Sequence, residues 1–214
     1  MNHVITIGRQ FGSGGHEVGR RLSAKYGIPF YDKELLTLTA EDSNFDESFL
    51  NKMDEKRPDF ISMSVSGFYS GPDMNLHNYY FSKDDVFLAV GKKMHELAEK
   101  GSCVFIGRCS DYVLRDLNPI NIFICAKIEE RIKRKFEIGK HPDFTEKEMK
   151  KHIEDRDKKR SKFYEYYSHE KWGECNHYHL CIDTSYIGVD GAVNLISQYL
   201  DDYGKGNIMP DNIL

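Results

Sequence analysis

The feature that most constrains the fold of this chain is a glycine-rich segment near its N-terminus, residues 8–19, which reads GRQFGSGGHEVG. It follows a short β-branched run at residues 3–7 and precedes Val18, Leu22 and Tyr26, whose spacing is that of one helical face. Glycines at such a junction let backbone N–H groups converge on phosphate oxygens, and the N-terminus of the helix adds positive potential. We therefore predict a phosphate-binding loop with contacts from Arg9, Gly12, Ser13, Gly14, Gly15, His16 and Glu17.

The rest of the chain alternates short apolar runs with helix-like segments. We predict strands at residues 3–7, 28–31, 103–106, 120–125 and 178–182. Helices are predicted after Asp32, at residues 84–100, at 128–136, from Thr145 onward and at 189–199. Because strands that alternate with helices form a parallel sheet covered on both faces, the fold class is α/β, a three-layer α/β/α domain with a five-stranded parallel sheet.

Two segments interrupt this alternation. Residues 41–83 are rich in Asp, Asn, Ser, Gly and aromatic residues, which is typical of a functional loop, and we expect an insertion on the acceptor side of the site. Residues 137–170 form a lid-like helical segment, in which Thr145 and Glu148 make the capping-box pattern T-x-x-E. We thus expect a single domain over residues 1–204 and a loose C-terminal tail at 205–214.

Composition and charge exclude several other classes. The formal net charge of -4 offers no strongly basic face, so nucleic acid is not an expected partner. The five cysteines include no CxxC pair, so neither a disulfide framework nor a zinc site is indicated. No apolar stretch approaches the roughly 20 residues of a membrane span, and no signal peptide precedes the first strand. We expect a cytoplasmic protein that does not bind a membrane.

The glycine-rich loop departs from the usual phosphate-loop pattern G-x-x-x-x-G-K-[ST]. When Gly12 and Gly14 are placed on the glycines of a G-x-G-K-x-T loop, Gly15 stands where the lysine belongs and Glu17 where the threonine belongs. The missing positive charge has to come from another residue. Arginine can grip a phosphate with two hydrogen bonds. The candidates are Arg9 in the loop and, unless they only form a solvated helix face, Arg20 and Arg21.

A dinucleotide-binding loop is an alternative interpretation. Gly12 and Gly14 fit the start of G-x-G-x-x-G, although Glu17 occupies the third glycine position. Asp32 ends the second predicted strand about 20 residues further on, where an acid that binds a ribose belongs. This alternative would make the protein an NAD(P)-dependent oxidoreductase.

Cations on the predicted lid helix complete the candidate site. Two arginines continue the apolar face of this helix and are expected to point inward, toward an anion or a carboxylate; the positions on the face are Met149, Ile153, Arg156, Arg160, Tyr164 and Tyr167. Phosphoryl transfer needs such cations because its catalysis consists mostly of positioning and charge stabilisation. We therefore assign catalytic contacts to Arg156 and Arg160.

The carboxyl edge of the sheet supplies the acceptor side. Arg108 follows the third predicted strand, and open parallel sheets bind ligands at this edge. We assign Arg108 a catalytic and substrate-binding contact with the acceptor phosphate; the alternative is a salt bridge to Asp111 or another local acid. Asp32 is a second substrate-binding candidate, and no metal ligand is assigned.

With these pieces assembled, the chain resembles the cytidylate kinase-like family. The matching segments occur in the expected order: Val4-Ile5-Thr6-Ile7 with Gly12-Ser13-Gly14, residues 30–36, Phe105-Ile106-Gly107-Arg108, Arg156-Asp157 and Ile182-Asp183-Thr184-Ser185. The resemblance implies a P-loop nucleotide kinase-like fold with a helical lid, ATP and Mg²⁺ as cofactors, and transfer of the γ-phosphoryl group to a nucleoside monophosphate.

Several positions depart from the pattern of cytidylate kinase proper. The loop lysine is Gly15, an arginine of the acceptor side is missing after Asp32, and the last arginine of the lid pattern is Phe163. Cys109 stands where an aspartate is common. These departures keep a second function open, that of a non-catalytic nucleotide-binding or regulatory protein on the same fold.

Overall fold

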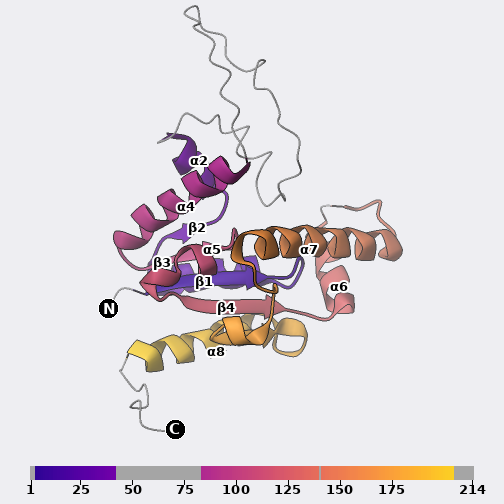
Figure 1. Ribbon diagram of the computed structural model, residues 1–214. Helices are drawn as coiled ribbons and strands as arrows, with labels where there is room; N and C mark the ends of the chain where they lie inside the picture. Colours follow the sequence, from indigo (N-terminus) through magenta and orange to yellow (C-terminus); the bar gives the residue numbers. More distant parts are fainter. Residues whose placement is uncertain (1–2, 42–82, 140, 205–214) are drawn as a thin grey trace, which may run out of the picture.

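The computed structural model describes residues 3–41, 83–139 and 141–204. Nearly all of the insertion expected at residues 41–83, and the tail expected at 205–214, lie outside the described residues. In the described part, five parallel strands form one sheet in the order β2-β3-β1-β4-β5 (Figure 1). Their bounds are β1 Val4–Arg9, β2 Phe30–Tyr31, β3 Cys103–Ile106, β4 Ile120–Cys125 and β5 Leu180–Asp183.

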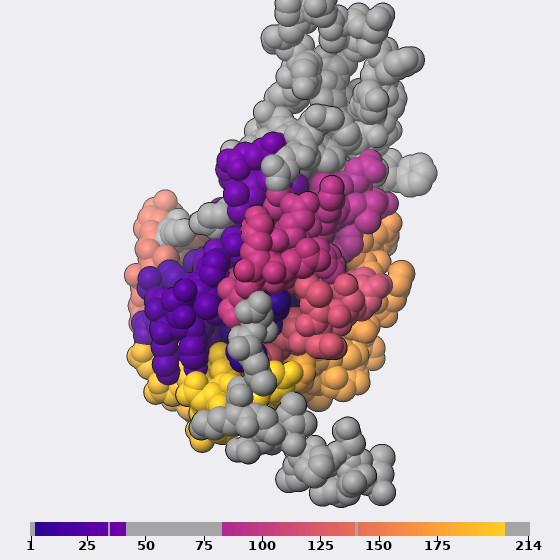
Figure 2. Space-filling view, turned by 90° about the vertical axis from the view of Figure 1, so that its left-hand side faces the viewer, coloured from indigo at the N-terminus to yellow at the C-terminus, as the bar shows by residue number. Residues whose placement is uncertain are grey.

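Helices cover both faces of this sheet, which confirms the three-layer prediction. On one face lie α1 (Gly15–Tyr26) and α8 (Thr184–Gly204), and Figure 2 shows the indigo N-terminal segments directly against yellow α8. Their apolar side chains enclose the central strands, because Ile7, Val18 and Ile196 are all fully buried in one cluster. Strands buried on both faces are near-continuous apolar runs, as β3 and β4 are.

The opposite face carries α2 (Glu34–Glu41), α4 (Lys83–Glu99) and the short α5 (Ser110–Val113). Leu35, Met94 and Phe105 form the centre of the apolar cluster on this side. Two single-turn 3₁₀ segments lie directly before strands in the chain, η1 (Arg115–Leu117) before β4 and η2 (Cys175–His177) before β5.

The lid-like segment consists of α6 (Ile128–Ile138) and α7 (Glu146–Ser168). The capping box predicted from the sequence is present: Thr145 Oγ1 accepts a hydrogen bond from the Glu148 N–H at 3.3 Å, and Glu148 Oε2 accepts one from the Thr145 N–H at 2.8 Å. Helix α7 then runs across the carboxyl end of the sheet (Figure 1). Its last turns bury Phe163 and Tyr164 against Cys109.

The strand order separates the two phosphate-loop interpretations. A dinucleotide-binding sheet has the order 3-2-1-4-5-6, with β2 beside β1. Here β3 lies between β1 and β2, with Ile7 paired to Ile106 and Phe30 to Val104. The oxidoreductase alternative therefore has no support from the topology. Among the described helices, none is both long enough and apolar enough to span a membrane.

Candidate functional site

The glycine-rich segment forms a tight loop between β1 and α1. Gly12 and Gly14 have φ angles of +83° and +88°, a left-handed conformation that favours glycine. Ser13 is fully buried, and its hydroxyl donates to the Gln10 carbonyl at 2.9 Å. From the start of α8, Thr184 Oγ1 donates to the Ser13 carbonyl at 2.6 Å. The loop is thus held in shape by its own backbone and by a helix that begins at residue 184.

Arg9 and Gly15 face each other across this loop. A Cβ atom on Gly15 would lie 2.5 Å from the Arg9 Cβ and 3.1 Å from its Cγ, so the arginine stem fills the space that a side chain at position 15 would need. When Gly14 is the second glycine of G-x-x-x-x-G-K, position 9 is that of the first glycine. The chain therefore has the cation at the first glycine position and glycine at the lysine position. Arg9 is 9% exposed.

Arginines of the lid-like segment bind the carbonyl groups of the loop. Arg134 of α6 donates to the Gly12 carbonyl at 2.6 Å, and Arg160 of α7 donates to the Arg9 carbonyl at 3.1 Å. These bonds take up backbone acceptors of the loop. Both lid helices are thereby anchored to the phosphate loop.

A carboxylate of α7 adds a third anchor. Asp157 Oδ1 accepts a hydrogen bond from the Phe11 N–H at 2.6 Å, and Asp157 Oδ2 pairs with the guanidinium of Arg131, which is buried. The Phe11 ring lies between lid cations, with Lys135 Nζ 4.0 Å from its centroid and the guanidinium carbon of Arg156 5.7 Å away. The loop, α6 and α7 therefore form one polar unit.

Asp32 directly follows β2, and its carboxylate lies between the guanidinium of Arg108 and the imidazole of His16. Arg108 Nη1 is 3.2 Å from Asp32 Oδ1, and His16 Nε2 is 3.2 Å from Asp32 Oδ2. Burial by itself raises the pKa of Asp32, but the hydrogen bond from His16 and the charges of Arg108 and Arg9 outweigh it, so the pKa is lowered. Asp32 thus remains a carboxylate, and Arg108 pairs with this acid rather than with the neighbouring Asp111.

The backbone that carries Arg108 has an unusual conformation. Gly107, Arg108 and Cys109 follow one another with φ angles of +66°, +54° and +58°. Positive φ is uncommon for residues other than glycine, and such residues cluster at functional sites. The turn aims the Arg108 side chain, which is 5% exposed, at the carboxyl edge between β1 and β3.

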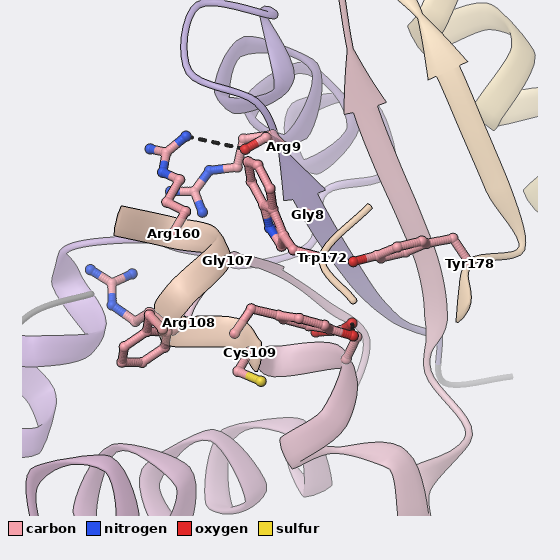
Figure 3. Close-up of a pocket in the computed structure, with 11 residues that line it drawn as sticks. Gly8, Arg9, Gly107, Arg108, Cys109, Arg160, Trp172 and Tyr178 are labelled. Atoms are coloured by element: carbon pink, nitrogen blue, oxygen red, sulfur yellow. Dashed lines mark hydrogen bonds between the residues drawn. The ribbon is translucent and has the colours of Figure 1, made fainter. Parts of the chain in front are cut away.

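A small cavity, part of it open to solvent, joins these residues. Figure 3 shows the side chains of Arg9, Arg108 and Arg160 on one side of it, with the Tyr178 hydroxyl entering from the other. The remaining lining residues are Gly8, Gly107, Cys109, Asp111, Phe163, Tyr164 and Trp172. The structure thus brings together three of the arginines predicted from the sequence.

The end of the cavity away from the arginines is formed by hydroxyl and carboxyl groups. The Tyr164 hydroxyl donates to Asp111 Oδ2 at 2.8 Å, and Glu170 Oε2 lies 3.3 Å from the same hydroxyl. Burial, followed by the nearby Glu170 charge, raises the pKa of Asp111, and burial likewise raises the pKa of Tyr164. The Tyr178 hydroxyl is buried and has no hydrogen-bond partner among the described residues.

Other predicted residues lie apart from the cavity. Arg156 is exposed beside Phe11 and does not line the cavity. Glu17 accepts hydrogen bonds from Arg20 and Arg21, and the bond from Arg20 is the main reason why the pKa of Glu17 is lowered to about 2. Arg20 and Arg21 thus belong to a surface ion-pair network. Of the three candidates for the missing charge, the structure places Arg9 alone at the cavity.

Sequence reasoning missed Arg131, Arg134 and Tyr178. A signal existed for Arg131, since it lies three residues after Ile128 and next to Ile132 on the helix face that is buried. The sequence gives no indication of a role for Tyr178, because whether its hydroxyl has a hydrogen-bond partner depends on the three-dimensional structure. In the described segments, no three His, Cys, Asp or Glu side chains gather as metal ligands.

Comparison with known proteins gives consistent results. A cytidylate kinase of Methanopyrus kandleri is 24% identical over 208 residues, which cover 92% of this chain and 93% of that protein. A solved structure described as an uncharacterized protein from Eubacterium ventriosum ATCC 27560 is 28% identical, with a TM-score of 0.67 over 94% of this chain and 99% of that one.

A shikimate kinase structure from Bacteroides thetaiotaomicron shares the fold at 13% identity, with a TM-score of 0.54 over 94% of this chain and 99% of that chain. The fold is thus that of P-loop kinases, and a nucleotide kinase-like phosphotransferase is the activity that goes with it. Residues 4–186 match the model of the cytidylate kinase-like family. The matched range contains the motifs at the phosphate loop, at Arg108 and at Asp157. The chain belongs to the cytidylate kinase-like family.

Proposed function

We propose that this protein transfers the γ-phosphoryl group of ATP to a nucleoside monophosphate or a related small anionic acceptor. The observation that carries the proposal is the convergence of Arg9, Arg108 and Arg160 on one cavity at the phosphate loop. They come from the ends of β1 and β3 and from the lid helix, so one site collects charge from three elements. Phosphoryl transfer depends on such positioned charge.

Each arginine has a different role in the proposed reaction. Arg9 supplies beside the loop the charge that lysine supplies in the usual pattern, and its planar guanidinium can bind two phosphate oxygens at once. Arg108, held by Asp32, binds the acceptor. Arg160 reaches the reacting phosphoryl group from α7, and Arg156 is the second lid cation near the loop tip. Closure of α7 on the loop excludes water.

The residues present also fit the nucleotide phosphates and Mg²⁺. Gly14 is the N-cap of α1 and Gly15 its first residue, so their backbone N–H groups lie at the helix end that favours anions. Mg²⁺ is usually held by phosphate oxygens, water and one or two carboxylates rather than by an all-protein cage. Asp32, which lies beside His16 in the first turn of α1, is a carboxylate that could hold it. When bound, Mg²⁺ would neutralise charge on the phosphates.

The proposal is tested by incubating the protein with ATP, Mg²⁺ and a panel of nucleoside monophosphates, and by measuring ADP formation. We expect turnover with at least one member of the panel. The matched control is the Arg108→Gln variant, which keeps a polar, hydrogen-bonding side chain but loses the charge; it should bind ATP and lose most turnover. Measurable ATP binding without turnover for any acceptor would exclude the kinase function.

A second candidate is a nucleotide-binding protein without catalysis. It is favoured by one observation, that Gly15 replaces the loop lysine and that Arg9 closes off that position. Calorimetry distinguishes the two candidates, because a sensor would bind ATP tightly and give no turnover in the same buffer.

A further inference from the structure

The Tyr178 side chain presents a buried polar group that the fold does not use. The residue is 9% exposed, and its hydroxyl has no hydrogen-bond partner among the described residues. The Tyr164 hydroxyl is nearby, and its own proton is donated to Asp111. Buried polar groups in folded proteins are nearly always paired, so an unpaired one requires an explanation.

The ring of Tyr178 is held firmly in place. It packs on Phe123, with 5.1 Å between the ring centroids. A Cβ atom on Gly8 would come within 2.9 Å of Phe123 and 3.4 Å of Tyr178, so β1 has room for these rings only because residue 8 is glycine. The hydroxyl is therefore fixed in position, which is what a group that recognises a ligand needs.

The hydroxyl points into the cavity, toward the side where the arginines lie (Figure 3). A ligand that fills the cavity would meet cations at one end and a neutral hydrogen-bonding group at the other. The cavity lies under α7, between the ends of β1 and β3, whereas α1 covers the other face of the sheet. It therefore lies beside Arg108, the residue that binds the acceptor in the proposed function.

We propose that Tyr178 recognises the phosphoryl acceptor through a hydrogen bond from its hydroxyl, while Arg108 and its neighbours hold the acceptor's anionic group. The acceptor is a monophosphate that carries a hydrogen-bonding hydroxyl, carbonyl or ring nitrogen on the side away from its charge. Asp111 is a poorer candidate for the hydrogen bond to the acceptor, because one of its oxygens already accepts a hydrogen bond from Tyr164. This inference rests on the proposed function, since it names a residue that selects the acceptor.

The test is calorimetric titration of the full chain with two probes, CMP and inorganic phosphate, without ATP. The Tyr178→Phe variant removes one oxygen and keeps the ring. CMP should bind the variant about tenfold more weakly than the wild type, because one hydrogen bond is lost. Phosphate, which reaches only the arginine end, should bind both proteins equally.

Two further variants separate recognition from a structural role. Because the Tyr178 hydroxyl has no hydrogen-bond partner among the described residues, Tyr178→Phe should melt at the same temperature as the wild type or slightly higher. Tyr164→Phe should lower the melting temperature, because Asp111 loses its donor. The matched control is Tyr199→Phe on α8, on the opposite face of the sheet, which should change neither probe.

Three outcomes would overturn the inference: no binding of CMP to the wild type, unchanged CMP affinity in Tyr178→Phe, or an equal loss for both probes. Because the titration needs no turnover, it is independent of the kinase assay. Turnover together with unchanged CMP affinity in the variant would remove this inference and leave the proposed function. CMP binding that depends on Tyr178, in a protein without turnover, would leave this inference and remove the proposed function.

Discussion

At the scale of single residues, this loop differs from the usual pattern at two positions. Position 9 is arginine where the pattern has its first glycine, and position 15 is glycine where the pattern has lysine. The arginine stem and a side chain at position 15 compete for one space, since the two Cβ atoms would be 2.5 Å apart. A lysine at position 15 is therefore compatible with this backbone only if residue 9 is small. The two substitutions have to occur together.

This exchange predicts the behaviour of three variants. Arg9→Gly should weaken ATP binding about 10- to 100-fold, because a charge-assisted contact to phosphate is lost. Gly15→Lys should be destabilised by about 1–3 kcal/mol through overpacking. The double variant Arg9→Gly/Gly15→Lys should recover both stability and ATP affinity. Calorimetry and thermal melting measure the two quantities.

The matched control for the exchange is Arg20→Gln, which alters an arginine of the exposed ion-pair network with Glu17. It should leave ATP affinity unchanged. If Arg9→Gly binds ATP as well as the wild type does, Arg9 does not replace the lysine.

Sequence alone could name Arg9 as a candidate but could not choose it over Arg20 and Arg21. The choice depends on which guanidinium already has a carboxylate partner on the surface and which one lines the cavity, and both are three-dimensional facts. The same limit applies to the two lid arginines. Their spacing placed both on the inner face, yet Arg160 lines the cavity and Arg156 is exposed.

At the scale of elements, the most accurate expectations were those with a local cause. The start of α7 follows from a capping box, which is a pattern of four residues, and β3 and β4 coincide with the predicted apolar runs. The predicted start of the last helix at residue 189 directly follows Gly188, whose φ of +64° kinks α8; the helical turn before the kink, which begins at Thr184, was not predicted. The insertion at 41–83 stays a prediction.

The capping box itself can be tested. Thr145→Ala removes the acceptor for the Glu148 N–H and should lower the free energy of unfolding by about 1 kcal/mol. Urea unfolding followed by circular dichroism measures this change. The matched control is Lys147→Ala, an exposed position in the first turn of the same helix, where a change within about 0.5 kcal/mol is expected. Equal losses in both variants would show that the cap does not stabilise α7.

At the scale of the whole molecule, the order of the strands decides which chemistry the phosphate loop serves. Alternating strands and helices predict a parallel sheet, but they do not predict which strand lies beside β1. Because β3 lies beside β1, Arg108 at the end of β3 is next to the loop. Asp32 follows β2, on the other side of β3, and pairs with Arg108 from there. The candidate site is therefore a product of topology, and its residues come from segments about 150 residues apart in the chain.

Asp32 joins three of these segments, so its ionisation should affect the stability of the whole molecule. Its pKa is lowered because the contributions of His16, Arg108 and Arg9 outweigh the effect of burial. A lowered pKa contributes stability above the pKa of the unfolded chain, about 3.9, and that stability is lost as the pH falls through the folded value. Asp32→Asn should therefore lower the free energy of unfolding by about 2 kcal/mol at pH 7.

The difference between wild type and Asp32→Asn should be constant from pH 7 to about pH 5 and should shrink below about pH 4, as Asp32 becomes protonated in the wild type. Urea unfolding at a series of pH values measures it. Asp190→Asn is the matched control: Asp190 also pairs with an arginine, but its side chain is 86% exposed, and such surface pairs contribute little. A difference that did not change down to pH 3 would mean that Asp32 stabilises the fold through its shape, and that the charge linking β2, α1 and β3 contributes nothing.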